Sequence, residues 1–334
     1  MTDDPQTLGE ACRLAAERLQ AGEVVALPTE TVYGLAANAL DPAAVATIFR
    51  VKERPSFDPL IVHVRNLDGV REVAEVPSEI EDVVGKLANA FWPGPMTLLL
   101  PKKPVVPDLV TSGLPTVAVR VPSHPVFRRV LKECRFPLAA PSANRFGRIS
   151  PTTAAAVEKE LGGRIPLIVD GGACGEGLES TILRVSRPPG SPKPVLEVVR
   201  SGPVTRERLK QFGIVKNAPR SAGPQAPGQL ASHYAPATPL RLLGEGERFV
   251  PEPGRRYGLL SVEGSPRGLN LSDFAVVAVL SPGSGKLGEA AIRLFAMLRQ
   301  LDEAGVDEII AEPVAEHGLG VAIMDRLRKA AGRG

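Results

Sequence analysis

Short apolar runs alternate with segments of helical periodicity along the first part of the chain. The apolar runs predict buried strands at 24–27, 60–64, 96–100, 116–121, 138–140, 167–170, 181–185 and 195–200. Between them, apolar side chains recur at helical spacing in segments that begin at 41 and 78, and near 124–134, 151–161 and 205–212. This alternation predicts an α/β fold, in which helices flank a sheet.

Two short sequences predict where helices begin. Asp41 can accept hydrogen bonds from the first free N–H groups of a helix, and Pro42 is tolerated in its first turn. Ser78 and Glu81 have the spacing of a capping box.

The periodic pattern is interrupted after residue 212, which predicts three regions: a large first domain at 1–212, a linker at 213–239 and a small domain at 240–334. The linker is rich in Pro, Gly, Ala and Ser. Because it carries His233 and Tyr234, it could also serve as an active-site lid. The last region alternates predicted strands (240–243, 257–262, 274–280, 308–311) with helices (287–305, 321–331), which favours a small parallel, Rossmann-like sheet.

Composition narrows the possible functions. A length of 334 residues with 43% hydrophobic residues is enough for two packed domains. A net charge of +3 is too small to predict a nucleic-acid-binding protein by itself. The 3 cysteines and 4 histidines are dispersed, which disfavours disulfides and a local metal site. The sequence shows no signal peptide and no apolar run long enough to cross a bilayer, so we expect a cytoplasmic protein.

Polar residues gather in four places beside predicted strands, where α/β folds usually hold ligands. Thr29, Glu30 and Thr31 follow the first strand, where a capped turn is an equally good explanation. Lys52 and Arg54 would face one way if the chain is extended there, which suits a polyphosphate. In isolation, the C-terminus of a solvated helix explains that pair better. The other two clusters are 139–152, which a turn and an N-cap explain only in part, and 170–181, where a Gly-rich hairpin is equally possible.

Six segments with polar or Pro/Gly-rich sequences occur in an order and at a spacing that is specific when they are taken together. The resulting pattern resembles the YrdC-like family, the threonylcarbamoyl-AMP synthases, in its long form with a C-terminal domain after a linker containing His233 and Tyr234. The resemblance implies a twisted mixed sheet with flanking helices in the first domain. The segments are 28–35, 52–64, 92–97, 117–122, 141–152 and 179–181.

The resemblance also implies a reaction. The family joins L-threonine, bicarbonate or CO2, and ATP with its Mg²⁺, and it yields threonylcarbamoyl-AMP and pyrophosphate. The product serves the N6-threonylcarbamoyl modification of adenosine 37 in tRNAs that read codons beginning with A. A tRNA threonylcarbamoyl transferase would complete that modification, and weak contact of this chain with tRNA is possible.

Site residues are implied by the same resemblance. The residues expected at the catalytic centre are Lys52, Arg54, Ser142 and Asn144. Those expected around ATP are Arg54, Asp58, Thr116, Ser142, Ser150, Arg200 and Tyr234, with the metal held through the phosphates. Those expected around L-threonine are Thr31, His63, Arg120, Ala140 and Ser180, with Thr29 beside the carbamate.

The sequence departs from the family pattern at four places. Glu53 replaces a usual glycine, Asp58 an asparagine and Ser201 a proline, and the linker at 228–233 lacks its usual basic residues. Asp58 could repel phosphate, contact the metal or face the base.

Two other functions are weighed against this one. An RNA-binding module would show a strongly salt-dependent affinity, but the small net charge weighs against it. A carbamoyl-transfer enzyme within a larger machine would need additional modules with Cys pairs, which the sequence does not contain.

Overall fold

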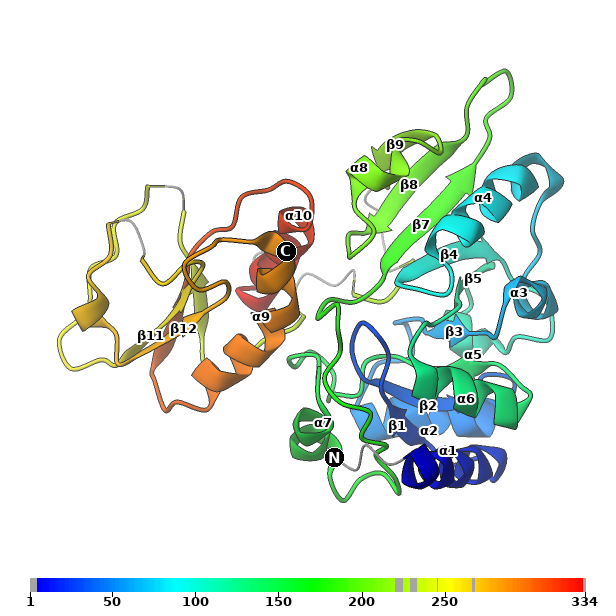
Figure 1. Cartoon of the computed structure of the whole chain (residues 1–334), viewed down its shortest axis with the longest axis horizontal. Helices are drawn as coiled ribbons and strands as arrows, with labels where there is room; N and C mark the ends of the chain where they lie inside the picture. The colour runs from blue at the N-terminus through cyan, green and yellow to red at the C-terminus, as the bar shows by residue number, and fades with distance from the viewer. Residues whose placement is uncertain (1–4, 220–224, 229–232, 245, 266–267, 333–334) are drawn as a thin grey trace. The chain divides into compact units, whose positions relative to one another are not determined.

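The computed structural model describes residues 5–219, 225–228, 233–244, 246–265 and 268–332 (Figure 1). Two compact units make up the chain. The first comprises residues 1–146, 151–175 and 179–229, and the second comprises 147–150, 176–178 and 230–334.

A nine-stranded mixed sheet forms the first unit, with the strand order β1-β2-β6-β3-β5-β4-β7-β8-β9. The pairs β3/β5, β4/β7 and β8/β9 are parallel and the other neighbours are antiparallel. The strands are β1 (Val25–Leu27), β2 (Gly34–Asn38), β3 (Ile61–His63), β4 (Met96–Pro101), β5 (Thr116–Arg120), β6 (Leu138–Ala139), β7 (Thr181–Ser186), β8 (Val195–Arg200) and β9 (Ile214–Asn217). The helices are α1 (Pro5–Gln20), α2 (Pro42–Lys52), α3 (Leu67–Val73), η1 (Ser78–Ile80), α4 (Glu81–Phe91), α5 (Asp108–Thr111), α6 (Pro125–Cys134), α7 (Ala154–Leu161) and α8 (Arg206–Leu209).

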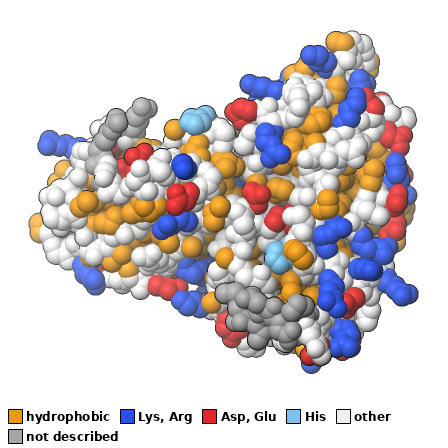
Figure 2. Space-filling model, in the orientation of Figure 1, with side chains coloured by type: hydrophobic (Ala, Val, Ile, Leu, Met, Phe, Trp, Pro, Cys, Tyr) orange, Lys and Arg blue, Asp and Glu red, His pale blue; other side chains and the backbone are white. Residues whose placement is uncertain are grey.

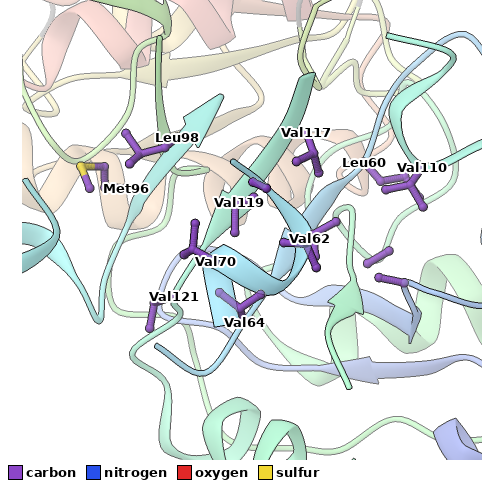
Figure 3. Packing of buried hydrophobic residues seen from close by; sticks show 14 of the residues in the cluster. Leu60, Val62, Val64, Val70, Met96, Leu98, Val110, Val117, Val119 and Val121 are labelled. Carbon is purple, nitrogen blue, oxygen red and sulfur yellow. The ribbon is translucent and has the colours of Figure 1, made fainter. Parts of the chain in front are cut away.

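The two faces of this sheet differ in chemistry because side chains alternate along each strand. One face is apolar: Val62 of β3, Leu98 of β4 and Val119 of β5 enter the main hydrophobic core (Figure 3). The neighbours of these residues along the strands point the other way. We call that side, which carries Ile61, His63, Thr97, Leu99, Ala118 and Arg120, the site face.

Helices α1 and α6 cover the part of the site face that lies nearest β1, β2 and β6. Leu19 of α1 and Phe127 of α6 belong to one buried cluster with Leu27 and Leu138 of the sheet. On the outer side of these helices, Lys and Arg side chains gather (Figure 2). They line a groove together with Glu17 and Glu133, and the cations include Arg13, Arg65, Arg128, Lys132 and Arg135.

The second unit contains a four-stranded sheet in the order β10-β13-β11-β12, and every pair in it is parallel. Its strands are β10 (Leu240–Leu242), β11 (Tyr257–Ser261), β12 (Val276–Val279) and β13 (Glu308–Ala311). Its helices are η2 (Leu271–Asp273), α9 (Leu287–Asp302) and α10 (Gly320–Ala330). Residues 147–150 belong to this unit, since Arg148 pairs with Asp302 at 3.2 Å and Arg299 donates to the carbonyl of Ile149.

Several predicted elements are corrected by the structure. Residues 167–170 form no strand, only a single bridge between Ile168 and Ala26. Ser78 does not cap a helix: it starts the 3-10 turn η1, and α4 begins at Glu81 without a side-chain cap. The Asp41 cap is confirmed, because its carboxylate accepts from the N–H of Ala43 at 2.9 Å.

Part of the predicted linker lies outside the described residues, namely 220–224 and 229–232. Of the rest, Ile214–Asn217 forms the edge strand β9, and Gln225–Gly228 lies within the first unit. No helix within the described residues is long and apolar enough to cross a membrane.

Candidate functional site

The loop between β1 and β2 is fastened by Thr29. Its hydroxyl accepts from the N–H groups of Thr31 and Val32 at 3.1 and 3.2 Å and donates to the carbonyl of Val32 at 2.7 Å. The same hydroxyl lies 2.8 Å from that of Thr31. These contacts turn the loop so that the side chains of Glu30 and Thr31 reach the end of β5.

Arg120, the last residue of β5, is the centre of the contacts at this end of the sheet. Its Nε donates to the carbonyl of Gly94 at 3.2 Å and its Nη1 to the hydroxyl of Thr31 at 3.0 Å. Its Nη2 lies 2.7 Å from Oε1 of Glu30. The guanidinium is buried, so these contacts fix its direction.

His63 lies beside Arg120, since the two residues are register partners on β3 and β5. Its ring packs against Phe127 of α6 in a tilted arrangement, with 4.9 Å between the ring centres. Burial lowers the pKa of His63 to about 3, and the positive charge of Arg120 adds to this effect. The imidazole is therefore neutral at neutral pH. Within the described residues, its Nδ1 is buried and makes no hydrogen bond.

A chain of hydroxyls continues across the site face from Arg120. Thr97 of β4 is the register partner of Arg120, and its hydroxyl lies 2.8 Å from that of Ser180. Arg200 of β8 donates to both oxygens of Ser180, through Nε to the carbonyl and through Nη2 to the hydroxyl, each at 3.0 Å. The site thus extends over the strands from β3 to β8.

Lys52 and Arg54 do not lie on an extended segment as predicted. Helix α2 ends at Lys52, and Glu53 adopts a left-handed conformation (φ 55°) that reverses the chain. The usual glycine of the family suits this conformation. Both cations are buried rather than solvated. Lys52 donates through Nζ to the carbonyls of Ser142 and Asn144, which shapes the loop after β6.

Arg54 and Asp58 form a buried ion pair. Nη2 of Arg54 lies 2.9 Å from Oδ2 of Asp58, and the guanidinium also donates to the carbonyls of Asp58 and Pro59. Burial raises the pKa of Asp58, although the nearby charges of Arg54, Lys52 and Arg200 oppose that rise. Arg54, Lys52 and Arg200 thus all act on the Asp58 carboxylate, while burial and the charge of Arg54 lower the pKa of Lys52 well below its ordinary value.

The segment Gln225–Gly228 lies on the site face. Ala226 shares a buried cluster with Ile61, Leu99, Ala118 and Ile182. The carbonyl of Pro227 accepts from Nη1 of Arg200 at 3.2 Å. This part of the linker therefore covers the apolar floor between the two charged ends of the site.

The structure brings most of the expected residues together in the first unit. Ala140 donates its N–H to the carbonyl of Ile61, and Ser142 forms a bridge with Gly34. Thr116 starts β5, four residues before Arg120 and on the same face. Ser150 and Tyr234 belong instead to the second unit, where Tyr234 packs against His233 and Phe295.

Sequence reasoning assigned no role to Glu30, Thr97 or Ala226. Thr97 gave one signal, since it is a polar residue inside the apolar run 96–100. Glu30 is one of the polar residues that follow the first strand, but the sequence does not indicate that its carboxylate contacts Arg120. The contacts of Ala226 depend on long-range packing and leave no local pattern.

The arrangement suits a ligand with an anionic group at each end. Arg120 offers a guanidinium flanked by hydroxyls, which is the geometry that binds a carboxylate. Lys52, Arg54 and Arg200 offer the positive charge that binds phosphates. The apolar floor between them is covered by Ala226, so a flat or aliphatic group could rest there only beside Ala226 or in its place.

Two family models match the chain. The family model Sua5_yciO_yrdC, described as "Telomere recombination", matches residues 17–202. A second model, described as "Threonylcarbamoyl-AMP synthase, C-terminal domain", matches residues 204–332.

Two curated relatives are named threonylcarbamoyl-AMP synthase. The protein of Pyrococcus abyssi is 41% identical, covering 96% of this chain and 94% of its own length. The protein of Bacillus subtilis is also 41% identical, covering 99% of this chain and 96% of its own.

The solved structure of Pyrococcus abyssi Sua5 complexed with L-threonine has a TM-score of 0.83 with this chain. It is 36% identical, and the match covers 97% of this chain and 95% of that one. The two-domain architecture of the present chain therefore matches that of a protein crystallised with an amino acid. The chain belongs to the Sua5/YciO/YrdC family, in the form that carries the C-terminal domain of threonylcarbamoyl-AMP synthases.

Proposed function

We propose that the protein synthesises threonylcarbamoyl-AMP from L-threonine, bicarbonate or CO2, and ATP, with release of pyrophosphate. Two relatives with this name are 41% identical to the chain over nearly its full length, which supports the enzyme class. The observation that carries the proposal is the site face, where a buried guanidinium and a group of buried cations flank an apolar floor. The guanidinium suits the carboxylate of an amino acid, and the buried cations suit the phosphates of a nucleotide.

L-threonine would bind at the Arg120 end. Its carboxylate would meet Arg120, and its hydroxyl and amine would find partners among Thr31, His63 and Ser180. The backbone at Ala140 would close that side. Neutral His63 can donate or accept one hydrogen bond, and it adds no second positive charge beside Arg120. Thr29 acts on this pocket through the turn that it fastens.

ATP would bind at the other end, with its phosphates near Lys52, Arg54 and Arg200 and near the loop that holds Ser142 and Asn144. Asp58 keeps Arg54 in place, and Thr116 lies on the strand beside it. We assign Ser150 and Tyr234 to the nucleotide as well, on the resemblance alone. Mg²⁺ would arrive with the phosphates and neutralise part of their charge.

The chemistry needs positioning and charge neutralisation more than a buried nucleophile. The amine of threonine adds to CO2 and loses a proton, which gives a carbamate. A carbamate oxygen then attacks the α-phosphorus of ATP as the bond to the β-phosphate oxygen breaks, so threonylcarbamoyl-AMP and pyrophosphate leave. Lys52, Arg54 and Arg200 would stabilise the charge that develops on the phosphates.

The product carries a mixed anhydride, which a transferase must consume. We propose that a tRNA threonylcarbamoyl transferase uses it to modify adenosine 37 of tRNAs that read codons beginning with A. The reaction would then belong to the cytoplasm, where such tRNAs are used.

Pyrophosphate release tests the proposal. Purified protein is given Mg-ATP, L-threonine and bicarbonate, and each is omitted in turn. We expect release only when all three are present, together with a product that has the mass of threonylcarbamoyl-AMP. Release without threonine would contradict the proposed acceptor, and absence of release despite ATP binding would contradict the reaction.

A further inference from the structure

Glu30 carries a largely buried carboxylate that has no role in the proposed reaction. Its side chain is 12% exposed, and it lies between two threonines of the loop after β1. Oε2 accepts from the N–H of Ser123 at 3.1 Å, which anchors the carboxylate to the chain just after β5. Oε1 lies 2.7 Å from Nη2 of Arg120.

The donors of Arg120 can be counted. A guanidinium has five N–H groups. Nε serves the carbonyl of Gly94 and one N–H of Nη1 serves Thr31. Nη2 lies 2.7 Å from Oε1 of Glu30, and this contact engages one of its two N–H groups.

Each terminal nitrogen of Arg120 therefore keeps an N–H group for a ligand. A pair of N–H groups on Nη1 and Nη2 is what a carboxylate needs for bidentate binding. Glu30 holds the guanidinium in this direction through Nη2 and leaves one N–H group on each terminal nitrogen.

We propose that Glu30 is a positioning residue for amino-acid binding, which orients Arg120 so that its terminal N–H pair faces the substrate carboxylate. This inference rests on the proposed function, and it assigns to Glu30 a role in recognising the α-carboxylate rather than in the chemical step.

The charge state of Glu30 agrees with this role. Burial raises the pKa of its carboxyl group, but Arg120 and the N–H of Ser123 lower it by more, so the pKa lies below its ordinary value. The group is therefore an anion at neutral pH and a poor base for the amine of threonine.

The test compares Glu30→Gln with Glu30→Asp and with the matched control Glu81→Gln. Glutamine keeps the size of the side chain and can still accept from Ser123, but it loses the charge. Glu81 pairs with Arg71 at 3.0 Å on the exposed surface, so its variant removes a carboxylate from an ion pair outside the site. The readouts are the Kd for L-threonine by calorimetry, KM for threonine and for ATP, and kcat.

We expect Glu30→Gln to raise the threonine Kd and KM about 10- to 100-fold, while kcat and the KM for ATP stay within about threefold. Glu30→Asp, which keeps the charge on a shorter stem, should recover part of the loss. If Glu30→Gln disturbs folding, as judged by thermal unfolding, the threonine Kd of Glu30→Asp is compared with that of the wild-type protein instead. A loss in kcat with unchanged threonine affinity would overturn the proposal, because it would place Glu30 in the chemical step.

A double-mutant cycle with Arg120→Ala separates an effect through Arg120 from an independent one. In the Arg120→Ala background, Glu30→Gln should change the threonine Kd by less than about threefold. An equal change in both backgrounds would refute the positioning role.

The calorimetry also keeps the two proposals apart. If the wild-type protein binds threonine but releases no pyrophosphate, the proposed reaction fails, while the Kd values still decide the role of Glu30. If the wild-type protein binds no threonine, both fail.

Discussion

Asp58 offers a prediction in which stability and ligand affinity move in opposite directions. The change is Asp58→Asn, which keeps the shape of the side chain and removes its charge. Asp58 pairs with Arg54 at 2.9 Å, and both side chains are almost fully buried. Since Arg54 keeps its bonds to two backbone carbonyls, we expect the free energy of unfolding to fall by about 1–3 kcal/mol.

The affinity for ATP should rise. Asp58 is the carboxylate surrounded by Lys52, Arg54 and Arg200, so it reduces the positive charge available to the phosphates. We take the Asp58 carboxylate and a bound phosphate as two unit charges about 7 Å apart. At an effective dielectric constant of about 20 their repulsion is roughly 2 kcal/mol, and salt and solvent reduce it by about half. Losing the repulsion should therefore lower the Kd for ATP about fivefold.

Calorimetry of ATP binding, with Mg²⁺ and with EDTA, measures this effect, and urea unfolding measures the stability. Glu81→Gln serves as the control, since it removes a surface carboxylate. Weaker ATP binding in EDTA would refute the reasoning, because Asp58 would then contact the nucleotide favourably. Weaker binding only with Mg²⁺ would show that Asp58 contacts the metal, and it would refute the repulsion as well.

Three further predictions concern other parts of the site. Thr97→Val removes the hydroxyl beside Ser180 and should raise the KM for threonine about threefold to tenfold with little change in the KM for ATP, as steady-state kinetics would show. Arg200→Lys cannot reproduce the three bonds to Ser180 and Pro227 and should lower kcat/KM for ATP about 10²- to 10³-fold; a loss below tenfold would contradict its phosphate role. His63 has a folded pKa of about 3, so protonation of the unfolded chain below pH 6.5 should cost stability as the pH falls. Between pH 7 and pH 5 the wild-type protein should lose about 2 kcal/mol more than His63→Leu in urea unfolding, and equal losses would contradict the assignment.

The sequence predicts seven strands of the first unit because they are short, continuous apolar runs, but it misses β2 and the edge strand β9, which it places in the linker. It does not predict α1, whose buried stripe contains small side chains such as Cys12, Ala15 and Ala16, a weak hydrophobic signal. It also predicts a strand at 167–170 where only one bridge forms. An apolar run alone does not say whether a partner strand continues beside it.

The Lys52–Arg54 segment shows a different limit. Alternation over three residues cannot distinguish a strand from the end of a helix, and the usual glycine that would mark such an end is replaced by Glu53. The expected consequence, two cations directed at one site, does not depend on an extended chain. It arises because the left-handed turn at Glu53 reverses the chain and leaves both side chains buried.

The roles of the remaining site residues follow from the two-residue period of the strands. In β5, Val117 and Val119 belong to the core, whereas Thr116, Ala118 and Arg120 face the site. Ala118 is small, so the floor between the two polar residues is low enough for Ala226 of the linker to rest on it. A ligand of any size on this floor must displace or share space with Ala226. Because the carbonyl of the next residue, Pro227, accepts from Arg200, movement of this segment would change a contact of a proposed phosphate-binding arginine. Occupancy of the floor and orientation of Arg200 are therefore coupled through two adjacent residues.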